Sequence, residues 1–132
     1  MDTPTQTQSP LQAADTSAVI EVTTQSFMAD VIEASQSQLV LLDLWAPWCG
    51  PCKQLTPVLE TLAENADGQI RLAKMNIDDH PEVAQQLKVQ SIPAVFAFKD
   101  GQPVDGFMGA LPESDIKKFI EKNLDGELGP SP

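Results

Sequence analysis

The chain has 132 residues, of which 42% are hydrophobic, and this length and composition suit one folded domain with a single core. With 19 acidic against 8 basic residues, its net charge is −11, which would repel nucleic-acid phosphates and anionic membrane surfaces. We therefore expect neither nucleic acid nor a membrane as a partner.

Both ends of the chain have the composition of tails. Residues 1–17 are rich in Thr, Gln, Ser and Pro, which predicts a disordered N-terminal tail. Residues 125–132 are rich in Gly, Pro and Ser, which predicts a flexible tail or the start of a linker. The folded domain is expected over residues 18–124. The N-terminus lacks the pattern of a signal peptide, so a cytoplasmic location is expected.

In the first part of the domain, apolar periodicity predicts a strand, a helix and a second strand. Residues 19–22 suit a short strand, and residues 24–35 suit a helix. The nearly unbroken apolar run Leu39–Trp45 predicts a strand that is covered on both faces, as in the middle of an α/β sheet. A helix is expected from Cys52 onward, and Pro57 is expected to kink it because proline has no N–H for the helical ladder.

The rest of the domain continues the alternation of strands and helices. The pattern predicts a strand over 70–77, a helix over 81–87 and a strand over 94–98. An Asp-Gly hairpin over 99–102 should lead into a strand over 104–108. The last predicted element is a helix whose apolar face carries Ile116, Phe119, Ile120 and Leu124. The resulting order βαβαβαββα predicts an α/β fold, with a central mixed β-sheet and helices on both faces.

The only two cysteines, Cys49 and Cys52, lie in the stretch WAPWCGPCK, residues 45–53. Zinc binding is one hypothesis, but a structural zinc site takes four Cys or His ligands, and His80 is the sole histidine. His80 is more simply interpreted as a solvated residue at a helix start. A purely structural disulfide is a second hypothesis, although so short a loop removes little entropy from the unfolded chain.

A third hypothesis, redox exchange, follows from the position of the pair between a buried strand and a helix. At a helix N-terminus, free N–H groups and the helix dipole stabilise a Cys49 thiolate, which is the form that attacks disulfides. Cys52 lies one turn further along and could attack the mixed disulfide that Cys49 forms. We favour this hypothesis, and we expect no bound metal.

Asp43 interrupts the apolar run Leu39–Trp45, where an unpaired charge is unfavourable. It is either a strand-end residue turned to water or a buried carboxylate with a raised pKa that accepts the Cys52 proton, directly or through one water. Lys74, in the neighbouring strand pattern, is a candidate partner that could tune Asp43.

The stretch from Trp45 to Lys53 resembles the active-site sequence of the thioredoxin family, and the likeness extends over residues 19–124. The resemblance implies a thioredoxin fold in which Cys49 attacks, Cys52 resolves, Asp43 is the buried carboxylate and Lys74 is its partner. It also implies a cis peptide bond before Pro93, facing the cysteines.

The resemblance further implies a docking surface for substrates and a set of structural positions. The docking residues would be Trp48, Gly50, Pro51, Ile77, Ile92, Pro93 and Met108, and the structural ones Trp45, Pro57 and Gly109. Single exposed hydrophobic residues are common, so Ile77 and Met108 could equally belong to the core. The chain departs from the usual family pattern in having Ala94 after Pro93 and Met108 in place of a small branched residue.

Residues 54–60 and 101–107 more narrowly resemble the thioredoxin domain of co-chaperedoxins, which carry C-terminal helical repeats and pass substrates to a chaperonin. Two functions are therefore expected as alternatives. The first is a protein-disulfide reductase without a bound cofactor, recycled by thioredoxin reductase and NADPH. The second is a redox-active domain that binds unfolded clients of a chaperone, with a chaperonin as partner only if a repeat domain follows.

Overall fold

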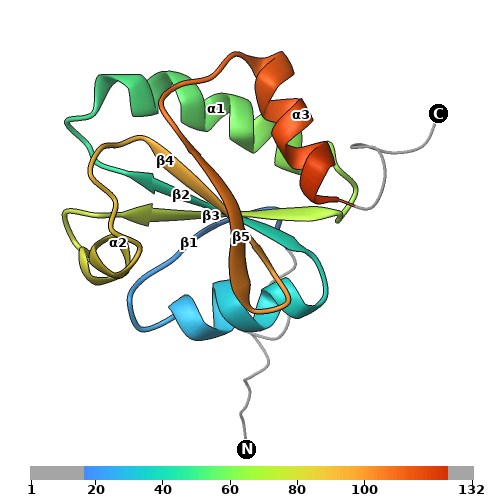
Figure 1. Ribbon diagram of the computed structural model, residues 1–132, viewed down its shortest axis with the longest axis horizontal. Coiled ribbons are helices and arrows are strands. Elements are labelled where there is room, and N and C mark those ends of the chain that lie inside the picture. The colour runs from blue at the N-terminus through green and yellow to red at the C-terminus, as the bar shows by residue number, and fades with distance from the viewer. Residues whose placement is uncertain (1–16, 125–132) are drawn as a thin grey trace, which may run out of the picture.

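The computed structural model describes residues 17–124 (Figure 1). The predicted tails, residues 1–17 and 125–132, lie outside the described residues except for Ser17. The described residues include all of the predicted domain, 18–124. No helix among them is long and apolar enough to cross a membrane.

The strands of the described residues form one five-stranded sheet in the order β1-β3-β2-β4-β5. Strands β1 (Val19–Glu21), β2 (Leu39–Trp45) and β3 (Ile70–Asn76) run parallel to one another. Strand β4 (Ala94–Lys99) pairs antiparallel with β2, and β5 (Gln102–Met108) pairs antiparallel with β4. The predicted mixed sheet with an antiparallel hairpin is confirmed.

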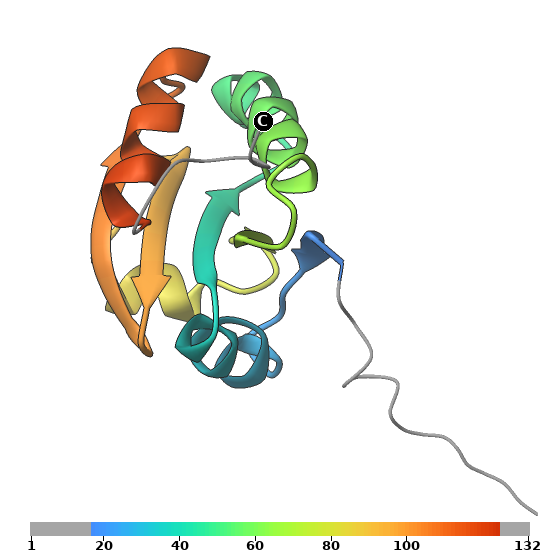
Figure 2. The ribbon, with the colours of Figure 1, turned by 90° about the vertical axis from the view of Figure 1, so that its right-hand side faces the viewer.

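Helices cover both faces of the sheet, as Figures 1 and 2 show. Helices α1 (Gly50–Glu64) and α3 (Glu113–Asn123) lie together on one face. The helical segments η2 (Met28–Glu33) and η3 (Ala34–Gln36) lie on the other face, where α2 (Glu82–Gln86) also packs. The two layers of helices explain why the residues of β2 are buried on both sides, since a strand between them meets no solvent.

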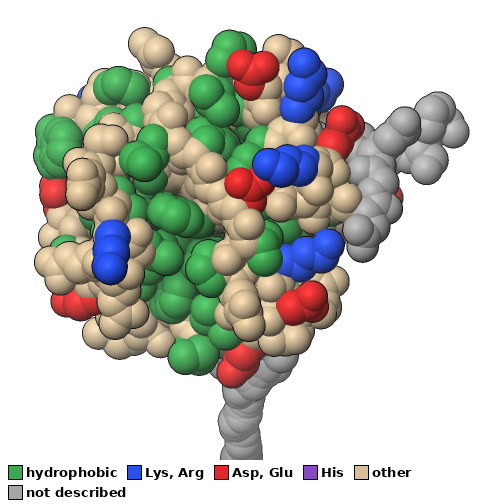
Figure 3. Space-filling view, viewed as in Figure 1, with side chains coloured by type: hydrophobic (Ala, Val, Ile, Leu, Met, Phe, Trp, Pro, Cys, Tyr) green, Lys and Arg blue, Asp and Glu red, His purple; other side chains and the backbone are tan. Residues whose placement is uncertain are grey.

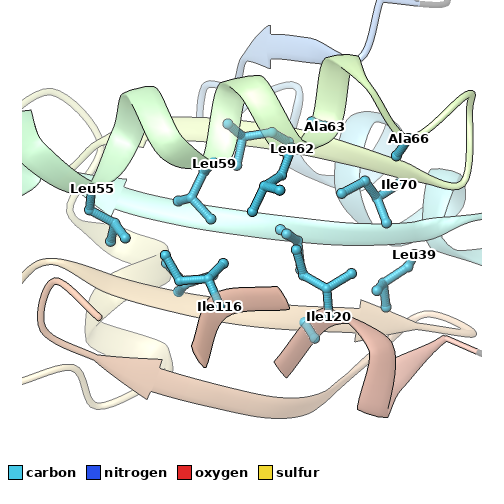
Figure 4. Packing of buried hydrophobic residues seen from close by; sticks show 13 residues of the cluster. Leu39, Leu55, Leu59, Leu62, Ala63, Ala66, Ile70, Ile116 and Ile120 are labelled. Carbon is cyan, nitrogen blue, oxygen red and sulfur yellow. The ribbon is translucent and has the colours of Figure 1, made fainter. Parts of the chain in front are cut away.

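The alternation of side chains along β2 divides the core in two. Leu39 and Leu41 pack beneath α1 and α3, in the cluster that Figure 4 shows, whereas Val40, Leu42 and Leu44 pack against the opposite layer. Asp43 has the same parity as Leu39 and Leu41, so its side chain points toward α1. The sheet thus places one carboxyl group in an otherwise apolar layer.

The predicted helix over residues 24–35 begins later than expected and is not a regular α-helix. Thr23 and Ser26 hold a turn before it: the Thr23 N–H donates to Ser26 Oγ at 2.9 Å, and the Ser26 N–H donates to Thr23 Oγ1 at 3.0 Å. This reciprocal pairing, similar to a capping box, satisfies both N–H groups in the turn that precedes the helical segments. The helical turns are then a π-helical segment followed by a 3₁₀ turn, η2 and η3.

Candidate active site

The cysteine pair lies where β2 ends and α1 begins. Cys49 is the N-cap residue of α1, and Pro51 occupies the first helical turn, where a missing N–H is tolerated. Cys49 and Cys52 form a disulfide with their Cα atoms 5.3 Å apart. The Cys52 N–H also donates to Cys49 Sγ at 3.2 Å. The first turn of α1 therefore directs a donor at the Cys49 sulfur, which is a setting that stabilises a thiolate.

The two sulfur atoms lie just below an exposed rim. Cys49 and Cys52 are only 3% and 2% exposed. Gly50 and Pro51 between them are exposed, and Trp48 on the preceding loop is 67% exposed. An approaching chain would therefore meet Trp48 and the first turn of α1 before it reaches the disulfide.

His80 takes no part in this site. Its Nδ1 accepts a hydrogen bond from the Thr24 N–H at 3.2 Å, and the Thr24 hydroxyl in turn donates to Glu82 Oε1 at 3.0 Å. The interpretation of His80 as a solvated residue is thus wrong in part, because its ring is half-buried against the loop after β1. Among residues 17–124, no three His, Cys, Asp or Glu side chains are grouped so that they could hold a metal ion.

Two loops close around the disulfide. Ile77, after β3, and Ile92, before β4, are half-buried and pack against the cysteines. The Ile92–Pro93 peptide bond is cis, as the resemblance implies. The Ile77 N–H donates to the Trp45 carbonyl oxygen at 2.9 Å, so the loop that carries Ile77 is fixed to the end of β2.

The loop with Pro93 is fixed from the other side by β5. Gly109 has a φ of +93°, which favours glycine, and its N–H donates to the Pro93 carbonyl oxygen at 2.9 Å. Met108, just before it, is 57% exposed, and Ser91 Oγ lies 3.5 Å from its sulfur. Met108 is therefore a surface residue beside the Pro93 loop rather than part of the core.

Hydrophobic side chains gather over the left and centre of the face in Figure 3, on the side where β2 and β3 end in Figure 1. Trp48 is further held by a hydrogen bond from its Nε1 to Asp78 Oδ1, at 3.1 Å. Of the predicted docking residues, Trp48, Gly50, Pro51 and Met108 are exposed, Ile77 and Ile92 are half-buried, and Pro93 is buried. The predicted surface thus combines these exposed residues with the half-buried side chains of Ile77 and Ile92.

Asp43 is fully buried beneath α1, so the alternative of a strand-end residue turned to water is wrong. Thr56 Oγ1 donates to Asp43 Oδ2 at 2.7 Å, while Oδ1 has no hydrogen-bond partner among the described residues. Burial raises the pKa of Asp43 to about 6, against the Thr56 hydrogen bond and the Lys74 charge, which lower it. The carboxyl group can therefore hold or release a proton near neutral pH.

Lys74 lies opposite Asp43 in the register of β2 and β3, but the predicted pairing is not a direct ion pair. Its Nζ lies 2.8 Å from Glu60 Oε2 and 3.3 Å from Glu21 Oε2. Burial acts to lower the pKa of Lys74, but the hydrogen bonds and charges of these two carboxylates outweigh it and raise that pKa. The Lys74 head group turns to these carboxylates, which are closer to solvent, and acts on Asp43 through its charge alone.

A pocket of about 270 Å³ opens beside this polar group. It is bounded by the end of β2, the first turns of α1 and the side chain of Lys74; its lining residues are Trp45, Ala46, Pro47, Cys52, Lys53, Thr56, Pro57 and Lys74. A space of this size holds several water molecules, since each occupies about 30 Å³ in the liquid. Cys52 and Thr56, whose hydroxyl donates to Asp43, therefore both line this pocket.

Sequence reasoning gave no role to Thr56 or Glu60, which contact Asp43 and Lys74. Both lie on α1, at four and eight residues after Cys52, so the helical period puts them on the face that carries Cys52. The sequence did contain a signal for them: Thr56 and Glu60 are polar residues on the face of α1 that packs toward the strand carrying Asp43.

The disulfide joins two cysteines separated by two residues at the start of α1, and the same helix covers a buried carboxyl of raised pKa. This arrangement serves thiol–disulfide exchange and defines an oxidoreductase of that class. The sequence model of the thioredoxin family matches residues 18–122. The chain is 41% identical to thioredoxin 1 of Nostoc sp. over 108 residues, covering 82% of this chain and 99% of that protein. It is 42% identical to thioredoxin of Staphylococcus saprophyticus over 107 residues, covering 81% and 99%.

The chain therefore belongs to the thioredoxin family. It is a thioredoxin-type thiol–disulfide oxidoreductase that reduces protein disulfides through its Cys49–Cys52 pair. The predicted fold class and the favoured redox hypothesis are confirmed.

Proposed function

We propose that Cys49 is the attacking residue and Cys52 the resolving one. The observation that carries this assignment is the hydrogen bond from the Cys52 N–H to Cys49 Sγ at the start of α1. It directs a donor and the positive end of the helix at the Cys49 sulfur, which favours the thiolate there. Cys52 lies within the first turn of α1 and remains next to the sulfur that it must attack.

In the reduced protein, the Cys49 thiolate attacks one sulfur of a client disulfide, and the other client sulfur leaves as a thiolate that takes a proton from solvent. Cys52 then loses its proton and attacks Cys49, which releases the second client sulfur as a thiolate. The client gains two electrons and, with solvent protons, two thiols. The domain is left with the Cys49–Cys52 disulfide, the state in which the structure holds it.

Asp43 is proposed as the group that takes the Cys52 proton in the second step. Its carboxyl is buried under the helix that carries Cys52, and its pKa of about 6 lets it change protonation near neutral pH. Lys74 acts on this carboxyl as a nearby positive charge, since its direct partners are Glu60 and Glu21.

Client proteins are proposed to dock along Trp48, Ile77, Ile92 and Met108, with backbone pairing at the Ile92–Pro93 segment. Thioredoxin reductase, with electrons from NADPH, is proposed to return the domain to the dithiol form. The site of action is proposed to be the cytoplasm, where a dithiol is kept reduced.

The assignment of Cys49 and Cys52 is tested by replacing each with serine. Cys49→Ser should abolish reduction of a protein disulfide in an assay with thioredoxin reductase and NADPH, because the attacking thiolate is gone. Cys52→Ser should instead accumulate a stable mixed disulfide with the client, visible as a covalent adduct on non-reducing gels. Turnover by Cys49→Ser, or an adduct formed through Cys52 in that variant, contradicts the assignment.

A second candidate function is client binding in the manner of a co-chaperedoxin domain. It follows from the resemblance that residues 54–60 and 101–107 suggest, and the exposed hydrophobic side chains of Trp48 and Met108 support it. The test is suppression of aggregation of an unfolding client by Cys49→Ser/Cys52→Ser, in which exchange is impossible. Suppression at stoichiometric amounts supports a binding role, and unchanged aggregation removes it for this chain.

A further inference from the structure

The proposed function leaves Thr56 without a part, although it is the residue that contacts the buried carboxyl. Thr56 lies four residues after Cys52 on α1, so both side chains are on one face of the helix. Its Oγ1 donates to Asp43 Oδ2 at 2.7 Å, and Asp43 Oδ1 has no partner within residues 17–124. Among residues 17–124, a single side-chain hydrogen bond, from Thr56, thus fixes the direction of the Asp43 carboxyl.

Thr56 contacts Asp43 and also lines the pocket. Asp43 is fully buried, whereas Thr56, Cys52 and Lys74 line the space of about 270 Å³. A hydroxyl group can donate one hydrogen bond while it accepts another, which neither an alkyl chain nor an ammonium group can do. The Thr56 hydroxyl can therefore donate to the carboxyl and accept a hydrogen bond from the pocket at the same time.

We propose that Thr56 is a positioning residue for disulfide exchange: its hydroxyl fixes the direction of the Asp43 carboxyl and links it to the pocket that Cys52 lines. The inference rests on the proposed role of Asp43. When the Cys52 proton passes to Asp43, the Cys52 sulfur bonds to Cys49 and the client thiolate leaves with the electron pair of the broken bond. The Thr56 hydroxyl then turns, so that it accepts a hydrogen bond from the protonated Asp43 carboxyl and donates its own hydrogen to solvent in the pocket, and the proton leaves by this route.

The other charged or titratable groups around Asp43 come from three elements. Glu21 lies on β1, Lys74 on β3 and Glu60 on α1, and the charges of all three act on the Asp43 carboxyl. Cys52 and Lys53, also on α1, line the pocket. Since Thr56 is uncharged, its replacement leaves all these charges in place, and a comparison of variants with and without the hydroxyl separates its effect from that of packing.

The experiment compares Thr56→Val, which has the same shape without the hydroxyl, with Thr56→Ser, which keeps it. Thr61→Val is the matched control, because Thr61 is an exposed residue on the same helix. Two quantities are measured on the full chain: the titration of the Asp43 carboxyl by NMR, and the rate of client reduction from pH 5 to 9. Trp45 and Trp48, the only tryptophans, both lie within four residues before Cys49 and can report the rate by fluorescence.

Loss of the hydrogen bond should raise the pKa of Asp43 and move the acidic limb of the rate profile to higher pH. We expect Thr56→Val to be about tenfold slower than the wild type at pH 6, because a hydrogen bond to a charged group is typically worth that factor or more. Thr56→Ser should restore both quantities, and Thr61→Val should leave both unchanged. In an Asp43→Asn background, Thr56→Val should slow the reaction no further.

The outcomes separate this inference from the proposed function. If Asp43→Asn is slow while Thr56→Val matches the wild type in rate and titration, the Thr56 inference is wrong and the role of Asp43 stands. Equal impairment of Thr56→Ser and Thr56→Val would also overturn it, since packing and not the hydroxyl would then be responsible. A wild-type rate profile in Asp43→Asn would overturn the proton-acceptor role and the Thr56 inference together.

Discussion

The two buried polar side chains of the described residues, Ser35 and Asp43, lie near opposite ends of β2 and are bonded very differently. Ser35 Oγ donates to the Ile32 carbonyl at 2.7 Å and accepts from the Gly101 N–H at 2.8 Å, so its hydroxyl is satisfied in both directions. Asp43 has a single hydrogen bond, and one of its oxygens has no partner in residues 17–124.

This difference separates a group that holds the fold together from one that can change its state. The Ser35 hydroxyl joins η3 to the β4–β5 hairpin and has no charge to gain or lose. The Asp43 carboxyl lies in an apolar layer, where burial of its charged form lowers the free energy of unfolding and raises its pKa to about 6. A buried polar group with incomplete hydrogen bonding is where chemistry is expected, and Asp43 lies beneath the helix that begins at the cysteines.

The largest effect should come from Asp43→Asn, measured as stability of the oxidised protein. The pKa of Asp43 is raised from 3.8 to about 6 on folding, so the wild type loses stability as pH rises from about 4 to about 6. The loss corresponds to about 3 kcal/mol, at 1.36 kcal/mol for each tenfold change in proton affinity. Asp43→Asn, which has no ionisation at this position, should be more stable than the wild type by up to this amount at pH 8.

The measurement is urea unfolding at pH 4, 6 and 8. The matched control is Asp79→Asn, which removes the same charge from an exposed position and should follow the wild-type pH dependence. An Asp43→Asn variant that loses stability between pH 4 and pH 6 as the wild type does would show that another group is responsible.

An intermediate and opposite effect is expected from Ser35→Ala. Removing the hydroxyl leaves the Ile32 carbonyl and the Gly101 N–H without their partner, which should destabilise the fold by about 1–3 kcal/mol. The loss should be the same at pH 4 and pH 8, and the rate of disulfide reduction should stay unchanged. Ser37→Ala, at an exposed neighbouring position, is the control and should change stability by less than about 0.5 kcal/mol. If the loss of stability in Ser35→Ala depended on pH, Ser35 would not differ from Asp43 in the way proposed.

The sequence predicts elements well where apolar patterning alone decides them. Strand β2 has the predicted bounds, Leu39–Trp45, because both of its faces are covered and the buried strand therefore coincides with the apolar run. The N-terminal helix was predicted less well, since residues 24–26 form a turn, closed by hydrogen bonds between Thr23 and Ser26, that apolar spacing does not separate from the helical segments after it. Local hydrogen bonds of this kind are weak signals in a sequence.

The candidate site could be predicted in part. The cysteine pair and Asp43 are conspicuous in the sequence, but the cis bond before Pro93 came only from the family resemblance. The partners of Asp43 and Lys74 depend on how α1 is rotated over β2 and β3, which periodicity does not give to within one side chain. Register does place Asp43 opposite Lys74, yet Lys74 pairs with the less buried Glu60 and Glu21.

The smallest effects on stability should come from removing the charges around Asp43. The pKa of Asp43 should shift in a direction that depends on which charge is removed, whereas Ser35 has no charge to respond. Lys74→Met removes a charge that lowers the pKa of Asp43, so that pKa should rise; Glu60→Gln removes one that raises it, so it should fall. Lys74 and Glu60 are partly exposed, at 19% and 32%, so loss of their ion pair should change stability by only about 0.2–1 kcal/mol. Carboxyl titration by NMR reads both shifts, with Lys117→Met on the exposed side of α3 as the control. Shifts of the same sign in Lys74→Met and Glu60→Gln would mean that reorganisation of the pocket, and not charge, governs the Asp43 carboxyl.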